Sequence, residues 1–133
     1  EWKFGKFDII INFGLFYHLK KNHDAHLKNC LKNCNLLFFE SVILDSNDSK
    51  IYFRQESGID QSLSEVGGTP TSKYVENIFI NSNFNYKRYD DIKLDSDPHI
   101  YSWTEQNSDI FDGYKRRFWI VNKNNLWNLH LVL

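Results

Sequence analysis

Two continuous apolar runs in the first third of the chain constrain its fold more than any other feature. The first covers residues 7–11, is broken only by Asp8 and is rich in β-branched isoleucine, and the second covers residues 36–44 with the sequence LLFFESVIL. Short continuous runs of this kind are typical of strands that are covered on both faces, as in parallel sheets. We therefore expect two buried strands here.

The segment between these runs has the spacing of an amphipathic helix over residues 24–33. Its apolar positions repeat at i, i+3, i+4 and i+7, and they are Leu27, Cys30, Leu31 and Cys34. A strand, a helix and a second strand in this order form a right-handed crossover, which makes the two strands parallel neighbours. The sequence thus predicts an α/β fold whose helix lies on the sheet.

The rest of the chain adds one helix and two strands to this unit. Thr69 is a candidate N-cap with Pro70 at the first helical position, where the missing N–H costs nothing. This helix should end near residues 81–83. The next apolar stretches predict a strand over residues 84–94, near an edge of the sheet, and a last strand over residues 116–123.

Two long segments show no periodicity, and we interpret them as loops. They are residues 45–68, which contain one amphipathic island, IYFRQ, and residues 95–113, and both are rich in polar side chains. Unstructured connections of this length in a compact domain are usually functional. The full length of 133 residues fits one domain, so we expect residues 1–133 to form a single domain with two functional loops.

Composition and charge exclude several classes of function. The net charge is −1 and the pI about 6.6, whereas proteins that bind nucleic acids concentrate Lys and Arg on one face. The basic cluster at residues 115–117 is too short to change this. Two cysteines do not form a disulfide framework, which favours the cytoplasm. No apolar stretch approaches the roughly 18 residues of a membrane span.

A group of candidate site residues follows the first predicted strand. In open parallel sheets, ligands bind outside the carboxyl ends of the strands. Gly14 would let the backbone approach a ligand closely, and His18 could act there as a polar contact or a proton acceptor. Alternatively, Tyr17 and His18 begin the next helix and make only surface hydrogen bonds. The group consists of Asn12, Phe13, Gly14, Tyr17 and His18.

Glu40 is a carboxylate late in an otherwise apolar strand. Because burial without a partner is costly, it must reach a partner, solvent or a substrate. It is either a residue of the pocket edge or an ordinary polar residue at a strand end.

Other chemistries have little support in the sequence. His26, Cys30 and Cys34 share a helical face, but structural zinc sites use close cysteine pairs on turns, and both cysteines belong to the apolar stripe. We therefore expect no metal. There is no GxSxG motif for a serine hydrolase and no P-loop or GxGxxG for a phosphate cradle.

The chain resembles class I S-adenosylmethionine-dependent methyltransferases. The resemblance lies in FDIIINFGLFYHL, then HDAHLKNCLKNC and NLLFFESVIL, which match the family's fourth strand, following helix and fifth strand. The segment GGTPTSKYVENIFINSNFNYKRYD is similar to the next helix and strand, and RRFWIVNK to the closing strand. The resemblance implies a partial Rossmann-like methyltransferase sheet, with strands four to seven and flanking helices.

The resemblance also implies an activity and a set of roles. The family's glycine-rich loop and its ribose-binding acidic residue precede the matched region, so we expect this chain to be the carboxyl-terminal half of a longer enzyme. That enzyme would transfer a methyl group from S-adenosylmethionine to a small-molecule acceptor. The implied cofactor-binding residues are Asn12, Phe13 and Gly14, the catalytic residues are His18 and Tyr17, and the substrate-binding residue is Glu40.

Two other functions stay open at this point. The chain could be a non-catalytic α/β module that keeps the fold for binding or assembly, or part of an unrelated α/β enzyme. A parallel sheet cut between its central strands would expose an apolar edge, so we also expect self-association through that edge. Neither a membrane nor a nucleic acid is an expected partner.

Overall fold

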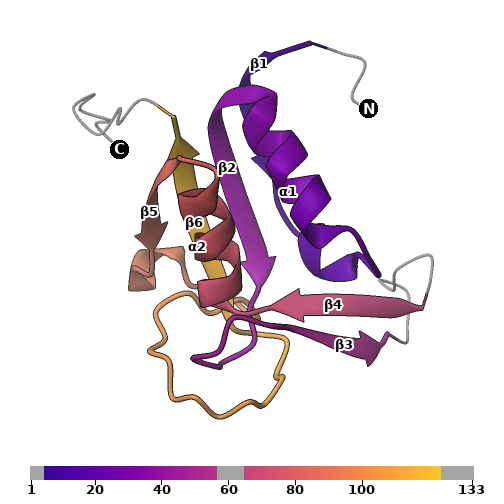
Figure 1. Ribbon diagram of the computed structural model, residues 1–133. Helices are drawn as coiled ribbons and strands as arrows, with labels where there is room; N and C mark the ends of the chain where they lie inside the picture. Colours follow the sequence, from indigo (N-terminus) through magenta and orange to yellow (C-terminus); the bar gives the residue numbers. More distant parts are fainter. Residues whose placement is uncertain (1–4, 57–64, 124–133) are drawn as a thin grey trace.

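The computed structural model describes residues 5–56 and 65–123 (Figure 1). In chain order it contains a parallel strand pair with its connecting helix, a second strand pair, a second helix and two further strands. No helix in these described ranges is long and apolar enough to cross a membrane. The elements are β1 (Phe7–Asn12), η1 (Phe16–His18), α1 (His23–Lys32), β2 (Cys34–Val42), β3 (Ile51–Gln55), β4 (Val66–Pro70), α2 (Ser72–Asn81), β5 (Asn85–Tyr89), η2 (Ile92–Leu94) and β6 (Arg116–Asn122).

The main sheet has four strands in the order β1-β2-β6-β5. Strands β1 and β2 are parallel, with Ile10 opposite Leu37, which confirms the predicted crossover. Strand β6 runs antiparallel to both of its neighbours and places Trp119 opposite Phe39 of β2. The last predicted strand therefore closes the sheet between β2 and β5, and β5 lies at an edge as expected.

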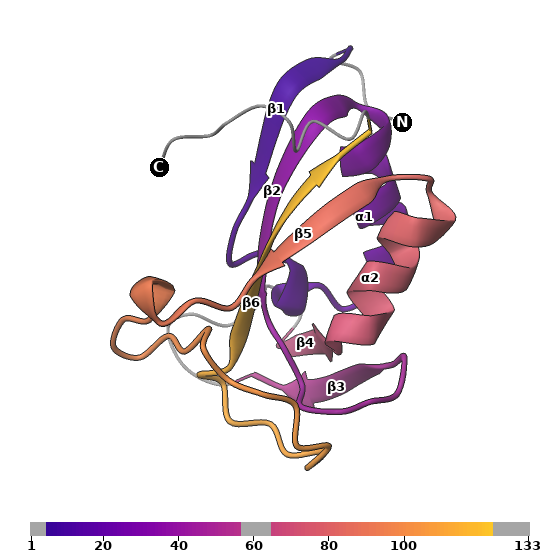
Figure 2. The ribbon, with the colours of Figure 1, turned by 90° about the vertical axis from the view of Figure 1, so that its left-hand side faces the viewer.

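Both helices lie on the same face of this sheet (Figure 2). Alternate residues of β2 and β6 point into the layer between sheet and helices, because successive side chains of a strand point to opposite faces. There they pack with apolar residues of α1 and α2. The fully buried core includes Phe16, Leu27, Leu31, Leu37, Phe39, Val75, Phe79, Trp119 and Val121.

The opposite face of β1 is exposed, which corrects the prediction that this strand is covered on both faces. Ile9 is 51% and Ile11 66% exposed, and Phe7 and Phe13 lie on the same face. The continuous apolar run cannot show which face a helix covers, and here α1 covers one face only. We call this exposed side of the sheet, on which Phe118 of β6 also lies, the open face.

Residues 45–68 hold more regular structure than the predicted loop. Strands β3 and β4 form an antiparallel pair, with Phe53 opposite Gly68, which runs across the end of the sheet where β2 ends (Figure 1). The two glycines of β4 permit close packing, since a Cβ on Gly67 would lie 2.6 Å from the carbonyl oxygen of Tyr17. A Cβ on Gly68 would lie 2.7 Å from Nε2 of His23.

The second helix begins two residues later than predicted. Pro70 ends β4, and Thr71 rather than Thr69 is the N-cap, because its Oγ1 accepts a hydrogen bond of 3.2 Å from the Tyr74 amide. The helix ends at Asn81, within the expected range.

Residues 95–113 form a loop without a helix or strand, and polar contacts fix its path. Asp45, fully buried after β2, accepts hydrogen bonds from the amides of Gln106 and Asn107 at 2.8 and 2.9 Å. It also pairs with Lys115 Nζ at 2.9 Å. Burial alone would raise the pKa of Asp45. The hydrogen bond and positive charge of Lys115, together with the hydrogen bonds from the two amides, outweigh burial, so the pKa of Asp45 lies below its ordinary value.

Candidate functional site

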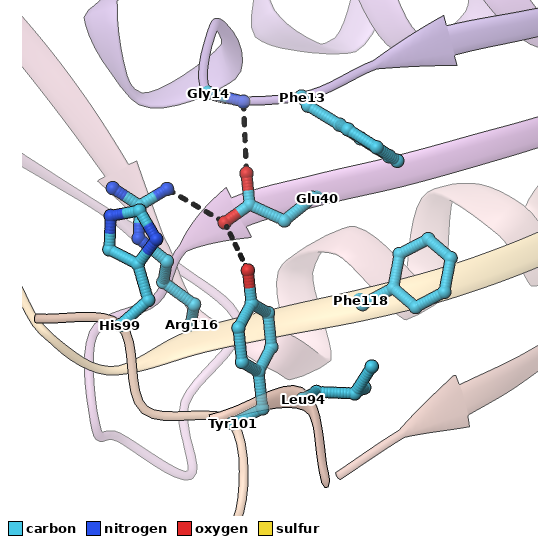
Figure 3. Close-up of a pocket in the computed structure, with 8 residues that line it drawn as sticks. All are labelled: Phe13, Gly14, Glu40, Leu94, His99, Tyr101, Arg116 and Phe118. Carbon is cyan, nitrogen blue, oxygen red and sulfur yellow. Dashed lines mark hydrogen bonds and ion pairs between the residues drawn. The ribbon is translucent and has the colours of Figure 1, made fainter. Parts of the chain in front are cut away.

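A cavity of about 470 Å³ lies at the carboxyl ends of β1 and β2, against the open face. Strand ends, the start of β6 and the long loop contribute to it (Figure 3). Its volume is within the range of about 300–1,000 Å³ that is typical of small-molecule sites. The lining residues are Phe13, Gly14, Glu40, Leu94, His99, Tyr101, Arg116 and Phe118.

Gly14 forms the turn that ends β1 at the edge of this cavity. Its φ of +66° is in the left-handed region, which favours glycine. A Cβ there would meet only Tyr17 Oη, at 4.0 Å, so the requirement for glycine is conformational rather than steric. The amide of Gly14 donates to Glu40 Oε2 at 2.9 Å, and this bond ties the end of β1 to the end of β2.

Glu40 stands at the centre of the polar contacts (Figure 3). It is only 6% exposed, and its Oε1 pairs with Arg116 Nη1 at 2.7 Å. Tyr101 Oη donates to the same oxygen at 3.5 Å. The carboxylate that the sequence placed late in an apolar strand is thus neutralised by a cation from the neighbouring strand β6, as a buried charge requires.

Arg116 links this carboxylate to Tyr17. Its Nη2 donates to Tyr17 Oη at 3.4 Å. Burial lowers the pKa of Arg116, but the hydrogen bond and charge of Glu40 raise that pKa by more, so it lies above its ordinary value. Nε of Arg116 is buried and has no hydrogen-bond partner in the part of the chain that the structure describes.

Tyr101 is a hydrogen-bond donor in this cavity. Burial, together with the charge of Glu40, raises the pKa of Tyr101 to about 12, so the phenol keeps its proton at neutral pH. The backbone amide of Tyr101 donates to Asp95 Oδ1 at 2.8 Å, which holds the loop in a turn at this point.

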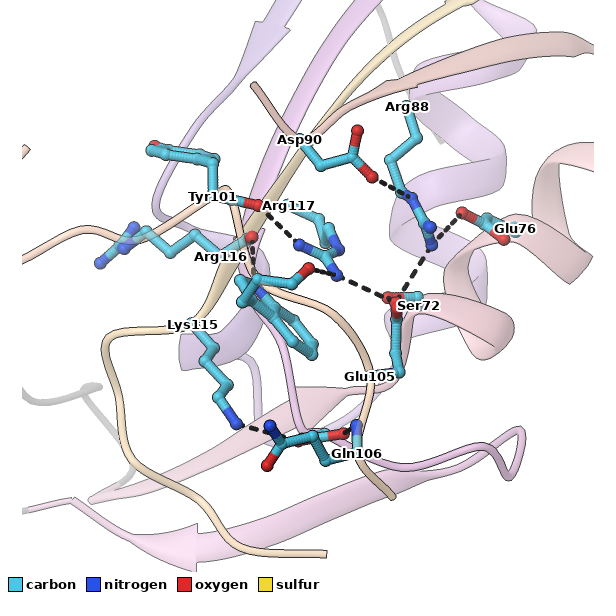
Figure 4. Close-up of polar contacts among 12 residues, drawn as sticks. Ser72, Glu76, Arg88, Asp90, Tyr101, Glu105, Gln106, Lys115, Arg116 and Arg117 are labelled. Carbon is cyan, nitrogen blue, oxygen red and sulfur yellow. Dashed lines mark hydrogen bonds and ion pairs between the residues drawn. The ribbon is translucent and has the colours of Figure 1, made fainter. Parts of the chain in front are cut away.

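Arg117 fixes the loop from the covered face of the sheet (Figure 4). Its side chain is fully buried, and it donates to the carbonyl oxygens of Tyr101 and Trp103, each at 2.7 Å. It also pairs with Glu105 at 3.1 Å, and its guanidinium lies 3.6 Å from the centroid of the Trp103 ring. Adjacent residues of β6 therefore have separate tasks, since Arg116 lines the cavity and Arg117 holds its wall in place.

His18 has a carboxylate partner outside the lining of the cavity. In the short turn η1, His18 Nδ1 lies 2.9 Å from Oε2 of the buried Glu56, just after β3. The rings of Tyr17 and His18 are in contact, with centroids 4.1 Å apart. The two residues form a short 3-10 turn rather than the start of a longer helix.

The side chain of Asn12 lies on the covered face, away from the cavity. Its Nδ2 is 2.7 Å from His26 Nε2 and 3.8 Å from Cys30 Sγ, while its buried Oδ1 has no partner among the described residues. Burial lowers the pKa of His26 and raises that of Cys30. Within the described ranges, no three His, Cys, Asp or Glu side chains are grouped so that they could hold a metal ion.

Of the six candidate residues from the sequence, Phe13, Gly14 and Glu40 line the cavity. Tyr17 is not among the lining residues, but its hydroxyl accepts a hydrogen bond from Arg116, which is one of them. His18 and Asn12 are not among the lining residues either, and the proposed roles of all six stay predictions. Sequence reasoning missed the other five lining residues, which come from η2, the long loop and β6. The alternation of Arg116 and Phe118 on one face of β6 was an available signal for two of these residues.

Comparisons with known proteins support the fold. No protein-family model matches the chain, and no curated protein sequence does. Among solved structures it is similar to the N-terminal domain of EvdMO1, crystallised in the presence of SAH (S-adenosylhomocysteine) and D-fucose, with a TM-score of 0.62 at 15% identity over 90% of this chain. The same domain with SAH bound gives a TM-score of 0.60 at 15% identity over 89% of this chain.

The chain spans about half the length of these neighbours, 48% and 46% respectively. At this level of identity the likeness concerns the fold alone. The chain therefore has a methyltransferase-like α/β fold, and its described strands correspond to one part of the larger neighbour domain.

Proposed function

We propose that this chain is part of a longer S-adenosylmethionine-dependent enzyme that transfers a methyl group to a small-molecule acceptor. The observation that carries the proposal is the cavity at the carboxyl ends of β1 and β2, where open α/β sheets bind their ligands. The fold of the SAH-bound neighbour supports the choice of cofactor.

Phe13 and Gly14 would hold the methionine end of the cofactor. They fit this task because both residues line the cavity and a Cβ on Gly14 would meet no atom nearer than 4.0 Å, so the turn at Gly14 leaves open space. When bound, S-adenosylmethionine supplies an electrophilic methyl group on a sulfonium. The rest of the catalytic effect then comes from aligning the acceptor and excluding water.

The acceptor would lie between the phenyl rings and the polar end of the cavity. Glu40 and Arg116 orient its hydroxyl group, and the apolar lining excludes water. His18, whose Nδ1 is oriented by Glu56 at 2.9 Å, would accept the hydroxyl proton of the acceptor on its other ring nitrogen, Nε2. Tyr17, between His18 and Arg116, positions both groups.

Isothermal titration with SAH tests the cofactor part of the proposal. We expect saturable binding that Gly14→Val weakens at least tenfold, because a β-branched residue fits the left-handed turn poorly. Gly5→Val is the matched control, since Gly5 also has a positive φ, +70°, but lies before β1 with no atom within 4 Å of its Cβ position. If the two substitutions weaken SAH binding equally, Gly14 has no specific role in the cofactor site.

The same titration separates the proposal from a non-catalytic module. A folded sample that gives no heat with SAH, in the longer protein as well as in this chain, would favour a binding or assembly role. If SAH binds, His18→Gln should lower the rate of methyl transfer at least tenfold and leave the affinity for SAH unchanged, because it removes the proposed proton acceptor but no proposed cofactor contact. A loss of rate in His99→Gln and not in His18→Gln would transfer the role of proton acceptor to His99.

A further inference from the structure

We propose that the cavity selects an uncharged, polyhydroxylated acceptor of the sugar type over ionised acceptors. This inference rests on the proposed function and specifies the substrate class of the same site. It starts from the pairing of the two charged groups on the cavity wall, Glu40 and Arg116, at 2.7 Å.

Glu40 and Arg116 are the only carboxylate and guanidinium among the described lining residues, and because they pair with each other neither is free to pair with an ionised ligand. An incoming phosphate or carboxylate would meet a guanidinium that Glu40 already neutralises, and an incoming ammonium would meet a carboxylate that Arg116 already neutralises. Either ion would lose its hydration in a half-enclosed cavity and gain no compensating partner. A neutral acceptor avoids this loss.

The same pair retains hydrogen-bonding capacity that suits hydroxyl groups. A carboxylate has about four acceptor positions and a guanidinium five donors. Glu40 accepts from Gly14 N, Arg116 Nη1 and, at 3.5 Å, Tyr101 Oη, which leaves about one acceptor position. Among the described residues, Arg116 Nη2 donates only to Tyr17 Oη, at 3.4 Å. Neighbouring hydroxyls can donate to the carboxylate and accept from the guanidinium, and bonds to charged groups are the stronger ones.

The remaining walls suit the carbon skeleton of a sugar. Phe13 and Phe118 meet edge to face, with centroids 5.8 Å apart, and Leu94 completes the apolar side. Flat rings beside one polar end match a molecule with an apolar C–H face and hydroxyls at its rim. Figure 3 shows this division, with Glu40, Arg116, Tyr101 and His99 together and Phe118 apart from them.

Three probes of similar size test the inference: methyl glucoside, glucose 6-phosphate and glucosamine, which are neutral, anionic and cationic at neutral pH. Each is titrated in the presence of saturating SAH and followed by saturation-transfer NMR. We expect the neutral probe to bind and each charged probe to bind at least tenfold more weakly. Tighter binding of either charged probe by the unaltered protein would overturn the inference.

Substitution of one partner at a time gives a readout that a purely structural pair would not give. Glu40→Gln leaves Arg116 without its counter-charge and should reverse the preference toward glucose 6-phosphate. Arg116→Gln should reverse it toward glucosamine. Lys93→Gln is the control, because this exposed residue of η2 lies next to Leu94 but does not line the cavity.

The outcomes separate the inference from the proposed function. Loss of the preference for neutral sugars with SAH binding intact would overturn only the sugar-type acceptor. Failure of SAH to bind would overturn the proposed cofactor assignment instead, whichever of the three probes bind. An unchanged order of the three probes in both variants, with circular dichroism showing a folded chain, would mean that the ion pair does not set the selectivity.

Discussion

The two faces of the four-stranded sheet are built from the same strands but differ in burial and in role. On the covered face, Leu37, Phe39, Trp119 and Val121 are fully buried beneath α1 and α2. On the open face, the alternate residues of the same strands include exposed isoleucines, several phenyl rings and the Glu40–Arg116 pair. One face accounts for stability and the other for the candidate site.

Adjacent residues of β6 make this difference measurable. Trp119 is fully buried against Phe39 and Phe79 and donates to Glu76 Oε1 at 3.0 Å. Phe118, its neighbour, lies half-buried on the cavity wall. A large side chain is thus placed on each face at neighbouring positions of one strand.

The largest expected effect is that of Trp119→Ala. Loss of a buried aromatic side chain should lower the free energy of unfolding by about 3–5 kcal/mol, whereas Phe118→Ala should lower it by about 1 kcal/mol, as expected for partial burial. Urea denaturation followed by circular dichroism measures both. Losses of similar size would contradict the division between the two faces.

Asp45 offers an intermediate effect with a defined pH dependence. Asp45→Asn removes the charge that pairs with Lys115 at 2.9 Å and should cost about 1–3 kcal/mol at pH 7. Because the folded pKa is lowered, this contribution is complete above the unfolded pKa of about 3.9 and is lost as the pH falls through the folded pKa. The difference between the variant and the unaltered protein should therefore shrink in acid.

Asp48→Asn is the control for this experiment, since Asp48 is 77% exposed and 3.5 Å from Lys50. Its effect should be under about 1 kcal/mol at any pH. A constant difference between Asp45→Asn and the unaltered protein from pH 7 to pH 3 would show that the charge of Asp45 does not stabilise the loop.

The smallest expected effect is that of Ile11→Thr on the open face. Threonine keeps the β-branched shape, and Ile11 is 66% exposed, so the free energy of unfolding should change by no more than about 0.5 kcal/mol. Val121→Thr, on the covered face, should cost more, about 1–3 kcal/mol, because it buries a hydroxyl. If Ile11→Thr is as costly, a second copy covers the open face, and sedimentation should show self-association that the substitution reduces.

Local pattern was sufficient for most of the fold. The apolar runs predict β1, β2 and β6, and the helical stripes predict α1 and α2, all in the correct order, because burial of apolar side chains leaves a local pattern in each of them. The pair β3 and β4 was missed because Val66–Pro70 contains two glycines and a proline, which are typical of loops. Those glycines are explained by the approach of β4 to Tyr17 and His23, a tertiary contact that no local pattern encodes.

The candidate site was predictable only where it belongs to a strand or its end. Gly14 and Glu40 stand out because a glycine and a carboxylate interrupt apolar runs. His99 and Tyr101 come from a loop whose path depends on Asp45 and Arg117, residues far away in the sequence. The exposure of the open face was missed for the same reason, since one run of isoleucines fits one covered face or two.

The anchors of the long loop have a consequence for how the cavity can change. Arg117 and Asp45 hold the loop through the carbonyl oxygens of Tyr101 and Trp103 and the amides of Gln106 and Asn107. Main-chain groups are the same for every residue other than proline, so these anchors are largely indifferent to the side chains they hold. The loop side of the cavity can therefore acquire new specificity by substitutions within one short stretch of the gene, while the sheet and its two anchors stay the same.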